Sequence, residues 1–327
     1  MTDFLRLDQS PIHQAAAIGD IAVLSNLLAA GHDINAKLDV LEDWGIFCLG
    51  LTPLMLAACS PRGATADTLR WLIEHGAYIT LRSTGNVTAA WYAAGNGVFF
   101  LQTSDDVPSA EQVERLRLLL QLGADPNETA DNGRSLLVEA CRAGDSQRVS
   151  LLLDHGVLPE PVLESIAPQY RRKYRKNSVS PLSRYQIPLF CAVSSWSADC
   201  VQLLITAGAD VNRLANNGAT ALMYACKPEI VQLLIDAGAD TTVIRQGGWD
   251  TFQEILKFEA EDDREEADIV RSLQLLIHHG ADIHATQRGA NRLYQAAFSR
   301  NPFAIARLLK LGATPTAWRP LLSALTW

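Results

Sequence analysis

The chain has 327 residues, of which 48% are hydrophobic and 20% are charged, and its formal net charge is −8 at pH 7. This length and apolar content are ample for a buried core, while 36 acidic against 28 basic residues argue against a protein that reads nucleic acid. No run of about 18 apolar residues predicts a membrane span, and we expect no secretion signal, because the first residues lack a basic segment followed by an apolar core.

Short glycine turns divide the chain into similar segments. The turn glycines are Gly31, Gly76, Gly123, Gly156, Gly208, Gly238, Gly280 and Gly312. Each follows an apolar stripe whose spacing predicts one wide buried face on a helix, and a glycine at that point ends the helix in a left-handed conformation without steric cost. Three of the intervals between successive turns are close to about 33 residues, the length of a helical repeat. The period predicts a stacked array with a long surface instead of one globular core.

A second, shorter helix rich in alanine is predicted upstream of the apolar stripes, for example at residues 15–17, 57–59 and 93–94. Small side chains let such a helix lie close against its neighbours. One pair of helices cannot bury its apolar face alone, but stacked pairs can. The sequence therefore predicts that each unit of the array is a pair of helices.

The chain resembles the ankyrin repeat family. The family's opening motif, Thr-Pro-Leu-His-x-Ala, occurs in related form at residues 52–57 and 10–15, and its closing motif, Leu-Leu-x-x-Gly-Ala-Asp-x-Asn, is nearly ideal at 203–212. The resemblance implies an all-α fold, an ankyrin-repeat solenoid of stacked helix-turn-helix units with finger loops. We expect a single array over residues 1–327, with about eight repeats and a C-terminal half repeat. The scaffold itself says little about function, because it serves many unrelated partners.

Four insertions interrupt the period. They lie near residues 40–50, 97–109, 162–185 and 255–268. The first carries a bulky apolar tip that includes Trp44 and Phe47. Either these side chains fold back over the array or they grip a partner, since a large exposed apolar patch is a liability without one.

The third and fourth insertions carry opposite charge. The third holds the only dense cationic run of the chain, residues 170–176, which includes Arg171, Arg172 and Lys173. A solvated loop, a site for an acidic protein surface and a phosphate site with stacking on two flanking tyrosines all stay open. The fourth is dense in Asp and Glu and predicts an extended, strongly negative helix pair, either solvated or facing a partner.

No residue pattern in the sequence predicts catalysis. There is no glycine-rich phosphate loop of the required spacing, and no Ser, Cys or His lies in a recognisable nucleophile motif. The histidines fall at motif or turn positions, where His13 matches the motif histidine that makes hydrogen bonds between repeats in the family. None of the six cysteines forms a Cys-x-x-Cys pair, so we expect reduced thiols packed among helices. We therefore predict a cytoplasmic protein with no enzymatic activity, catalytic residue, metal or cofactor.

What remains is a binding surface. In the family, the fingers and the short helices form a concave face, and the variable residue before the motif alanine belongs to it. Here this position holds Leu56, Tyr92, Glu139 and Tyr224, among others, and Trp249 lies on the finger side. Tyr and Trp bury much area at low entropy cost, which favours Tyr92, Tyr224 and Trp249 as partner contacts. Packing within the array is the alternative for each of them.

Three function hypotheses follow. The leading one is a non-catalytic scaffold or inhibitor that binds one specific protein partner through the concave face and the inserted loops, for example to neutralise an enzyme or a toxin. The alternative is the substrate- or partner-recruiting portion of a larger enzyme, suggested by an apolar half repeat that stops at Trp327. The second alternative is nucleic-acid binding through residues 170–176. The sequence gives no membrane partner and leaves the oligomeric state open.

Overall fold

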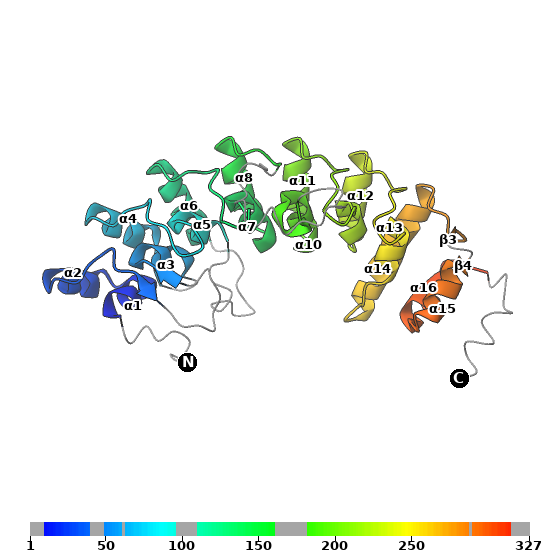
Figure 1. Cartoon of the computed structure of the whole chain (residues 1–327), viewed down its shortest axis with the longest axis horizontal. Helices are drawn as coiled ribbons and strands as arrows, with labels where there is room; N and C mark the ends of the chain where they lie inside the picture. Colours follow the sequence, from blue (N-terminus) through cyan, green and yellow to red (C-terminus); the bar gives the residue numbers. More distant parts are fainter. Residues whose placement is uncertain are drawn as a thin grey trace. The chain divides into compact units, whose positions relative to one another are not determined.

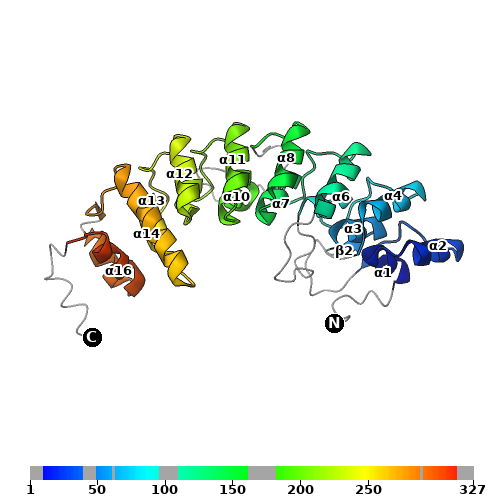
Figure 2. The ribbon, with the colours of Figure 1, turned by 180° about the vertical axis from the view of Figure 1, so that it is seen from behind.

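A computed structural model of the chain describes residues 10–39, 49–60, 63–95, 110–160, 182–287 and 290–314. The chain divides into two compact units: Met1–Arg175 with Tyr185–Cys191 form the first, and Lys176–Arg184 with Ala192–Trp327 form the second. Short helices follow one another in pairs along the chain (Figure 1, Figure 2), and each pair corresponds to one predicted repeat.

The first unit contains four helix pairs among its described residues. They are α1 (Pro11–Ile18) with α2 (Ile21–Ala29), α3 (Pro53–Cys59) with α4 (Ala66–Glu74), α5 (Ala89–Ala94) with α6 (Ala110–Gln121), and α7 (Leu136–Ala143) with α8 (Ser146–Asp154). The first helices of the pairs, α1, α3, α5 and α7, pack side by side in one layer, and the second helices α4, α6 and α8 pack in another (Figure 1). The alanine-rich first helices therefore lie close together, as the sequence predicts.

The second unit continues the pattern. Its pairs are α10 (Pro188–Ser194), whose residues are shared between the two units, with α11 (Ala198–Thr206); the 3-10 helix η5 (Ala221–Tyr224) with α12 (Pro228–Asp236); α13 (Thr251–Leu256) with α14 (Asp263–His278); and α15 (Arg292–Phe298) with α16 (Pro302–Lys310). A short 3-10 helix, η4 (Arg184–Gln186), precedes α10. Helix α12 packs between α11 and α14, so this unit also has a layer of second helices.

Strands are confined to two short hairpins in the described part of the chain. Strand β1 (Leu38–Asp39) pairs antiparallel with β2 (Leu49–Leu51), and β3 (Thr286–Gln287) pairs antiparallel with β4 (Ala290–Asn291). Both hairpins lie in finger segments between helix pairs. The all-α class and the ankyrin-type arrangement of helices predicted from the sequence are confirmed.

The eight turn glycines all adopt the left-handed conformation that the sequence predicts. Their φ angles run from +79° at Gly156 to +100° at Gly76. No atom lies within 4 Å of the place where a β-carbon would stand at any of the eight. Backbone conformation, and not crowding, therefore favours glycine at these positions.

Three buried arginines tie the second helix of one pair to the end of an earlier first helix. Arg115 on α6, Arg148 on α8 and Arg307 on α16 are at most 2% exposed. Their guanidinium groups donate, respectively, to the carbonyl oxygens of Ala57 and Ser60, of Ala93 and Gly95, and of Leu256 and Phe258. The last carbonyls of a helix have no partner within the helix, so each arginine satisfies groups that would otherwise be buried without hydrogen bonds.

The apolar core follows the predicted stripes with one difference. Leu204 on α11 and Leu234 on α12 are fully buried at 0% exposure, as the stripe predicts. Their neighbours Leu203 and Leu233, which we also expected to be buried, are only half-buried. The stripe is therefore narrower than the run of apolar residues suggests, because only one side of each short helix faces the adjacent repeats.

The described cysteines are packed inside the array as expected. Cys59, Cys141, Cys191, Cys200 and Cys226 are all buried. Cys48 lies outside the described residues, as do residues 97–109 and most of the insertions near 40–50 and 162–185.

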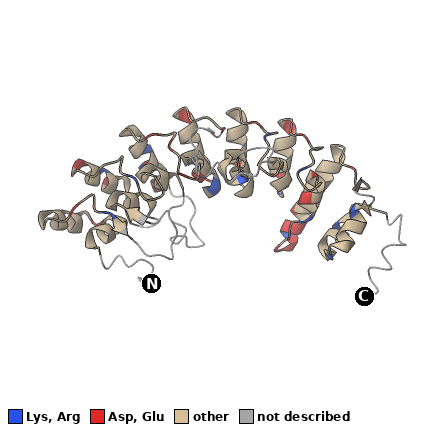
Figure 3. Cartoon of the chain, viewed as in Figure 1, with Lys and Arg blue, Asp and Glu red and all other residues tan. Residues whose placement is uncertain are grey.

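The acidic insertion near 255–268 is described and forms the end of α13, a connecting segment and the start of α14. Acidic residues cover the N-terminal half of α14 (Figure 3). Two of them have partners on neighbouring elements: Asp268 accepts from the Lys227 ammonium at 3.2 Å, and Glu266 pairs with Arg307. The insertion is therefore partly built into the array and is not only a solvated face.

His13 joins the first repeat to the second. Its Nε2 lies 3.0 Å from the carbonyl oxygens of both Ala36 and Leu51, and its Nδ1 lies 2.6 Å from the Ser10 hydroxyl. Carbonyl oxygens only accept, so Nε2 carries the proton and the hydroxyl donates to Nδ1. The predicted hydrogen bonds between repeats are present. Burial lowers the pKa of His13 below its ordinary value of 6.5.

We predict that His13 makes stability depend on pH. Since its folded-state pKa is lowered, the unfolded chain binds more protons below about pH 6.5, and the contribution of His13 is complete above that pH and lost as the pH falls through the folded-state pKa. His13→Gln cannot titrate. Urea unfolding should show that this substitution costs stability at about pH 7.5 and costs less at about pH 5. A cost that stays the same at both pH values would contradict the prediction.

Candidate functional site

Exposure of the variable residue before the motif alanine changes along the chain. It is buried at Leu56, Tyr92, Glu139 and Cys191. It is half-buried at Tyr224, Glu254 and Gln295, which belong to the last three helix pairs. Gln14, the first member of the series, is exposed in the first unit. The series therefore offers surface to a partner at Gln14 and again in the last three helix pairs of the second unit.

Leu56 and Tyr92, two of the predicted partner contacts, are buried in the array. Each side chain is 1% exposed, so neither offers surface unless the array opens there. The ring of Tyr92 packs edge-on against Trp91, with 5.4 Å between ring centroids. The Tyr92 ring is thus packed within the array. Burial at these positions comes from neighbouring repeats and cannot be read from the motif.

Glu139 is also committed within the array. Its side chain is 8% exposed, and its carboxylate forms ion pairs with Arg134 and Arg142. Both arginines lie within five residues of Glu139 and fix its carboxylate on the first helix α7. A partner that contacted Glu139 would first have to displace these cations.

Tyr224 is the last residue of the 3-10 helix η5 and is half-buried. The Asn217 side-chain amide donates to its hydroxyl at 3.2 Å, and the Arg184 guanidinium lies over the ring, 4.6 Å from the centroid. A hydroxyl held at one end and a cation held on the ring face fix the side chain in one orientation. Tyr224 is therefore a pre-positioned aromatic with surface still exposed.

Trp249 stands just before α13 and is half-buried. The Lys257 ammonium lies 3.3 Å from the centroid of its ring and pairs with the Glu254 carboxylate at 3.3 Å. Glu254 also accepts from Arg245 at 2.7 Å. Burial lowers the pKa of Lys257, and the Glu254 carboxylate opposes this shift. The ion pairs and the ring contact hold Trp249 in place.

A mainly apolar pocket of about 200 Å³ opens beside Trp249. Helices α13 and α15 supply most of its walls: Leu256 and Ala296 are apolar, and the Gln253 side chain donates to the Gln295 side chain between them. Arg292 forms a further part of the lining. Its guanidinium makes two hydrogen bonds to the Asp250 carboxylate, at 2.9 and 2.7 Å, so this wall is rigid.

The other predicted contacts cannot be placed. Trp44, Phe47, Arg171, Arg172 and Lys173 all lie outside the described residues. Within the described ranges, no three His, Cys, Asp or Glu side chains come together to hold a metal ion. No helix in those ranges is both long and apolar enough to cross a lipid bilayer.

Three family models match the chain. The model described as Ankyrin repeats (3 copies) matches residues 162–245, that described as Ankyrin repeats (many copies) matches 106–153, and that described as Ankyrin repeat matches 49–84. Together the matched segments cover just over half of the sequence. The chain belongs to the ankyrin repeat family. Ankyrin repeats form a scaffold for protein–protein interaction, and the fold is typically non-catalytic.

One known ankyrin protein resembles part of the chain. The ankyrin repeat, SAM and basic leucine zipper domain-containing protein 1 of Ornithorhynchus anatinus is 31% identical over 144 residues, which are 44% of this chain and 26% of that protein. The match thus spans about a quarter of the relative.

A solved ankyrin structure has a similar fold. The human ASB11 ankyrin repeat domain is similar with a TM-score of 0.57 and 20% identity, over 84% of this chain and 99% of that domain. The ankyrin repeat domain of Bcl-3, a unique member of the IkappaB protein family, has a TM-score of 0.49 and 22% identity, over 80% and 98% respectively. The likeness to the ASB11 domain concerns the fold alone.

Sequence reasoning missed most of the pocket beside Trp249. Lys257 follows Glu254 by three residues, which is a helical ion-pair spacing and a usable signal. Gln253 and Gln295 meet across 42 residues, and nothing in their local sequence predicts it. Long-range contacts of this kind depend on how the last two repeats stack.

Proposed function

We propose that this chain is a non-catalytic scaffold that binds one protein partner through the second unit. The contact is the aromatic surface, defined here as Tyr224, Trp249, Lys257 and Gln295. The observation that supports the proposal is the half-buried Trp249 held beside an apolar pocket of about 200 Å³. An aromatic side chain next to a pocket that accepts an anchor residue is typical of interface hot spots.

The aromatic surface is already ordered without a partner. Lys257 holds the Trp249 ring, and Arg184 and Asn217 hold the Tyr224 ring. Side chains that are fixed before binding lose little conformational entropy when the complex forms. An apolar side chain of the partner would fill the pocket beside Trp249, while Lys257 would meet a carboxylate at its rim. Neutralising an enzyme or a toxin is the role that we propose for this binding.

Replacing both aromatic residues, Tyr224→Ala with Trp249→Ala, should weaken partner binding by roughly 2 kcal/mol or more, because truncated hot-spot residues lose area that the partner buries. The partner is first captured from native-host extract and identified by mass spectrometry. Its affinity for the wild-type chain and the variant is then measured by calorimetric titration.

Tyr78→Ala is the matched control, since Tyr78 is 63% exposed and belongs to the first unit, whereas the aromatic surface belongs to the second. It should leave affinity unchanged. Unchanged affinity of the double variant, with its circular dichroism spectrum and melting temperature preserved, would show that the partner binds elsewhere.

The sequence adds the basic segment 170–176 to the proposal. The charges of Arg171, Arg172 and Lys173 speed association with the partner, so their neutralisation should slow association and flatten its dependence on salt. Two alternatives are separable: the intact mass of the native protein reveals a larger enzyme, and a steep fall of affinity with salt reveals nucleic-acid binding at 170–176. A cytoplasmic location fits the five buried cysteines, none of which forms a disulfide.

A further inference from the structure

Trp196 occupies a backbone position that favours glycine. It lies between α10 and α11 with a φ of +59°, in the left-handed region. Gly19 and Gly144 hold the corresponding turns after α1 and α7, with φ of +82° and +69°. A residue with a β-carbon is strained in this conformation, and the Trp196 side chain is 51% exposed. Neither the turn nor core packing therefore accounts for a tryptophan here. The Lys227 ammonium lies over the ring, 5.0 Å from its centroid, and half of the residue's surface stays exposed.

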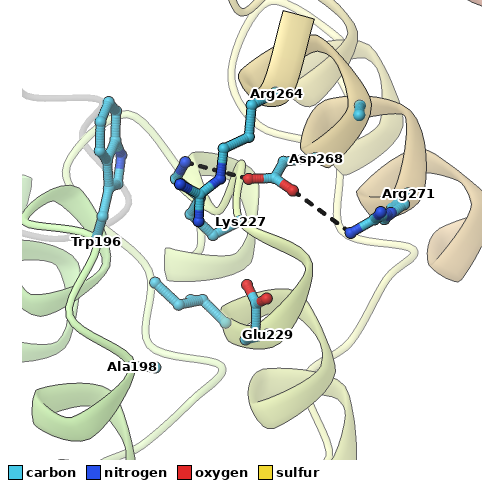
Figure 4. Close-up of a pocket in the computed structure, with 9 residues that line it drawn as sticks. Trp196, Ala198, Lys227, Glu229, Arg264, Asp268 and Arg271 are labelled. Atoms are coloured by element: carbon cyan, nitrogen blue, oxygen red, sulfur yellow. Dashed lines mark hydrogen bonds and ion pairs between the residues drawn. The ribbon is translucent and has the colours of Figure 1, made fainter.

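The Trp196 ring lines a pocket of about 350 Å³ in the second unit. Figure 4 shows Lys227, Arg264, Asp268 and Arg271 around this pocket, with Glu229 at its other side. The basic and acidic groups come from the N-terminal end of α12, with its N-cap residue Lys227, and from the first nine residues of α14. The pocket is thus assembled from three successive helix pairs and is separate from the aromatic surface.

Hydrogen-bond donors exceed acceptors in this pocket. The Asp268 carboxylate is shared, since one oxygen pairs with Lys227 at 3.2 Å and the other with Arg271 at 3.8 Å. Arg264 is exposed and makes no hydrogen bond or ion pair with any residue that the structure describes. Three cations therefore surround a carboxylate that engages only two of them, and most of their N–H groups stay available to an anion.

The surrounding charges determine which kind of anion the pocket favours and which part of the pocket that anion occupies. Three cations and two carboxylates, Asp268 and Glu229, line the pocket, which leaves one net positive charge. A single carboxylate matches that charge, whereas a dianionic phosphate exceeds it. Glu259 and Glu265 border a small adjoining cavity beside Trp196, so an anion is repelled there and is favoured at Arg264 and Arg271.

We propose that this pocket binds a protein segment in which a carboxylate side chain is next to an apolar one. The apolar side chain packs on the exposed ring of Trp196, and the carboxylate accepts hydrogen bonds from Arg264 and Arg271. The pocket is a second interaction surface, beyond the one proposed above. It explains why a strained position holds a large exposed ring, because glycine would fit the backbone but give the segment no surface.

The test uses the full-length chain and a short fluorescein-labelled, C-terminally amidated peptide with the central sequence Glu-Leu-Glu. Fluorescence anisotropy should show binding, and a Gln-Leu-Gln peptide should bind about tenfold more weakly or not at all. Trp196→Gly should lose about tenfold in affinity while the melting temperature stays the same or rises, because strain is removed. Arg264→Gln should weaken binding and flatten its salt dependence.

Arg300→Gly is the matched control. Arg300 has a φ of +52° at the corresponding turn after α15 and does not line the pocket, so its replacement should relieve strain and leave peptide affinity unchanged. The Tyr224→Ala, Trp249→Ala variant should also bind the peptide normally, which separates this proposal from the proposed function.

Several results would overturn the proposal. They are no binding by the wild-type chain, equal binding by Trp196→Gly, and equal binding of the Gln-Leu-Gln peptide. Tighter binding of a phosphoserine peptide or of a single-stranded oligonucleotide would instead identify a phosphate site.

Discussion

Arg148→Ala is expected to destabilise the first unit by about 3–5 kcal/mol, the usual cost of breaking a buried ion pair from one side. The Arg148 side chain is fully buried, and its partner Asp145 is 3% exposed. Removing the guanidinium leaves the Asp145 carboxylate buried without its cation. It also leaves the carbonyl oxygens of Ala93 and Gly95 without this donor. Equilibrium unfolding in urea, followed by circular dichroism, measures the loss.

Arg117→Ala is the control that separates the effect of burial on stability from the effect of charge. Arg117 also pairs with an acidic neighbour, Glu114, but its side chain is 41% exposed, and exposed ion pairs contribute at most about 1 kcal/mol. We expect this control to change stability by less than that. If Arg148→Ala cost no more than Arg117→Ala, the buried arginines would have no special role in joining repeats.

The repeat pattern of this fold could be predicted because it depends on local features. Each turn glycine ends a helix through its own backbone, so Gly31 and Gly312 could be identified without knowledge of their surroundings. His13 also behaves as its motif implies, since its partner Leu51 lies in the adjacent repeat. Features set by one repeat and its neighbour are therefore accessible from the sequence.

Features set by packing against several repeats were less accessible. Motif position alone predicted that Tyr92 and Tyr224 would both lie on the binding surface. Tyr92 is 1% exposed, however, and Tyr224 is half-buried. Arg148 and Arg307 were not singled out from the sequence, and their role depends on carbonyl groups about 50 residues away. Sequence spacing carries no information on such partners.

The candidate surfaces show the same division. Trp249 was predicted from its residue type and its finger position, and it does lie beside a pocket. Trp196 was missed because a tryptophan between two helices has no motif. Trp196 is a candidate because it has a positive φ and an exposed ring, and both features are visible only in the structure. Residue chemistry thus identifies candidates, while backbone conformation and burial decide among them.

Leu204→Ala is expected to cost about 2–5 kcal/mol, because it leaves a cavity in a core that relaxes only in part. Leu204 is fully buried on α11, which packs against α12. In an array each repeat is stabilised by its neighbours, so the loss should reach beyond α11. Urea unfolding of the wild type and the variant gives the difference in free energy.

Leu203→Ala is the matched control, since it removes the same atoms from the adjacent position of α11. Leu203 is only half-buried, and its removal should cost about 1 kcal/mol, in proportion to the smaller apolar area withdrawn from water. Equal losses for the two substitutions, or a loss below about 1 kcal/mol for Leu204→Ala, would mean that the core between α11 and α12 lies on a different face of the helix. The expected order follows from burial alone, because helix propensity and residue type are identical at the two positions.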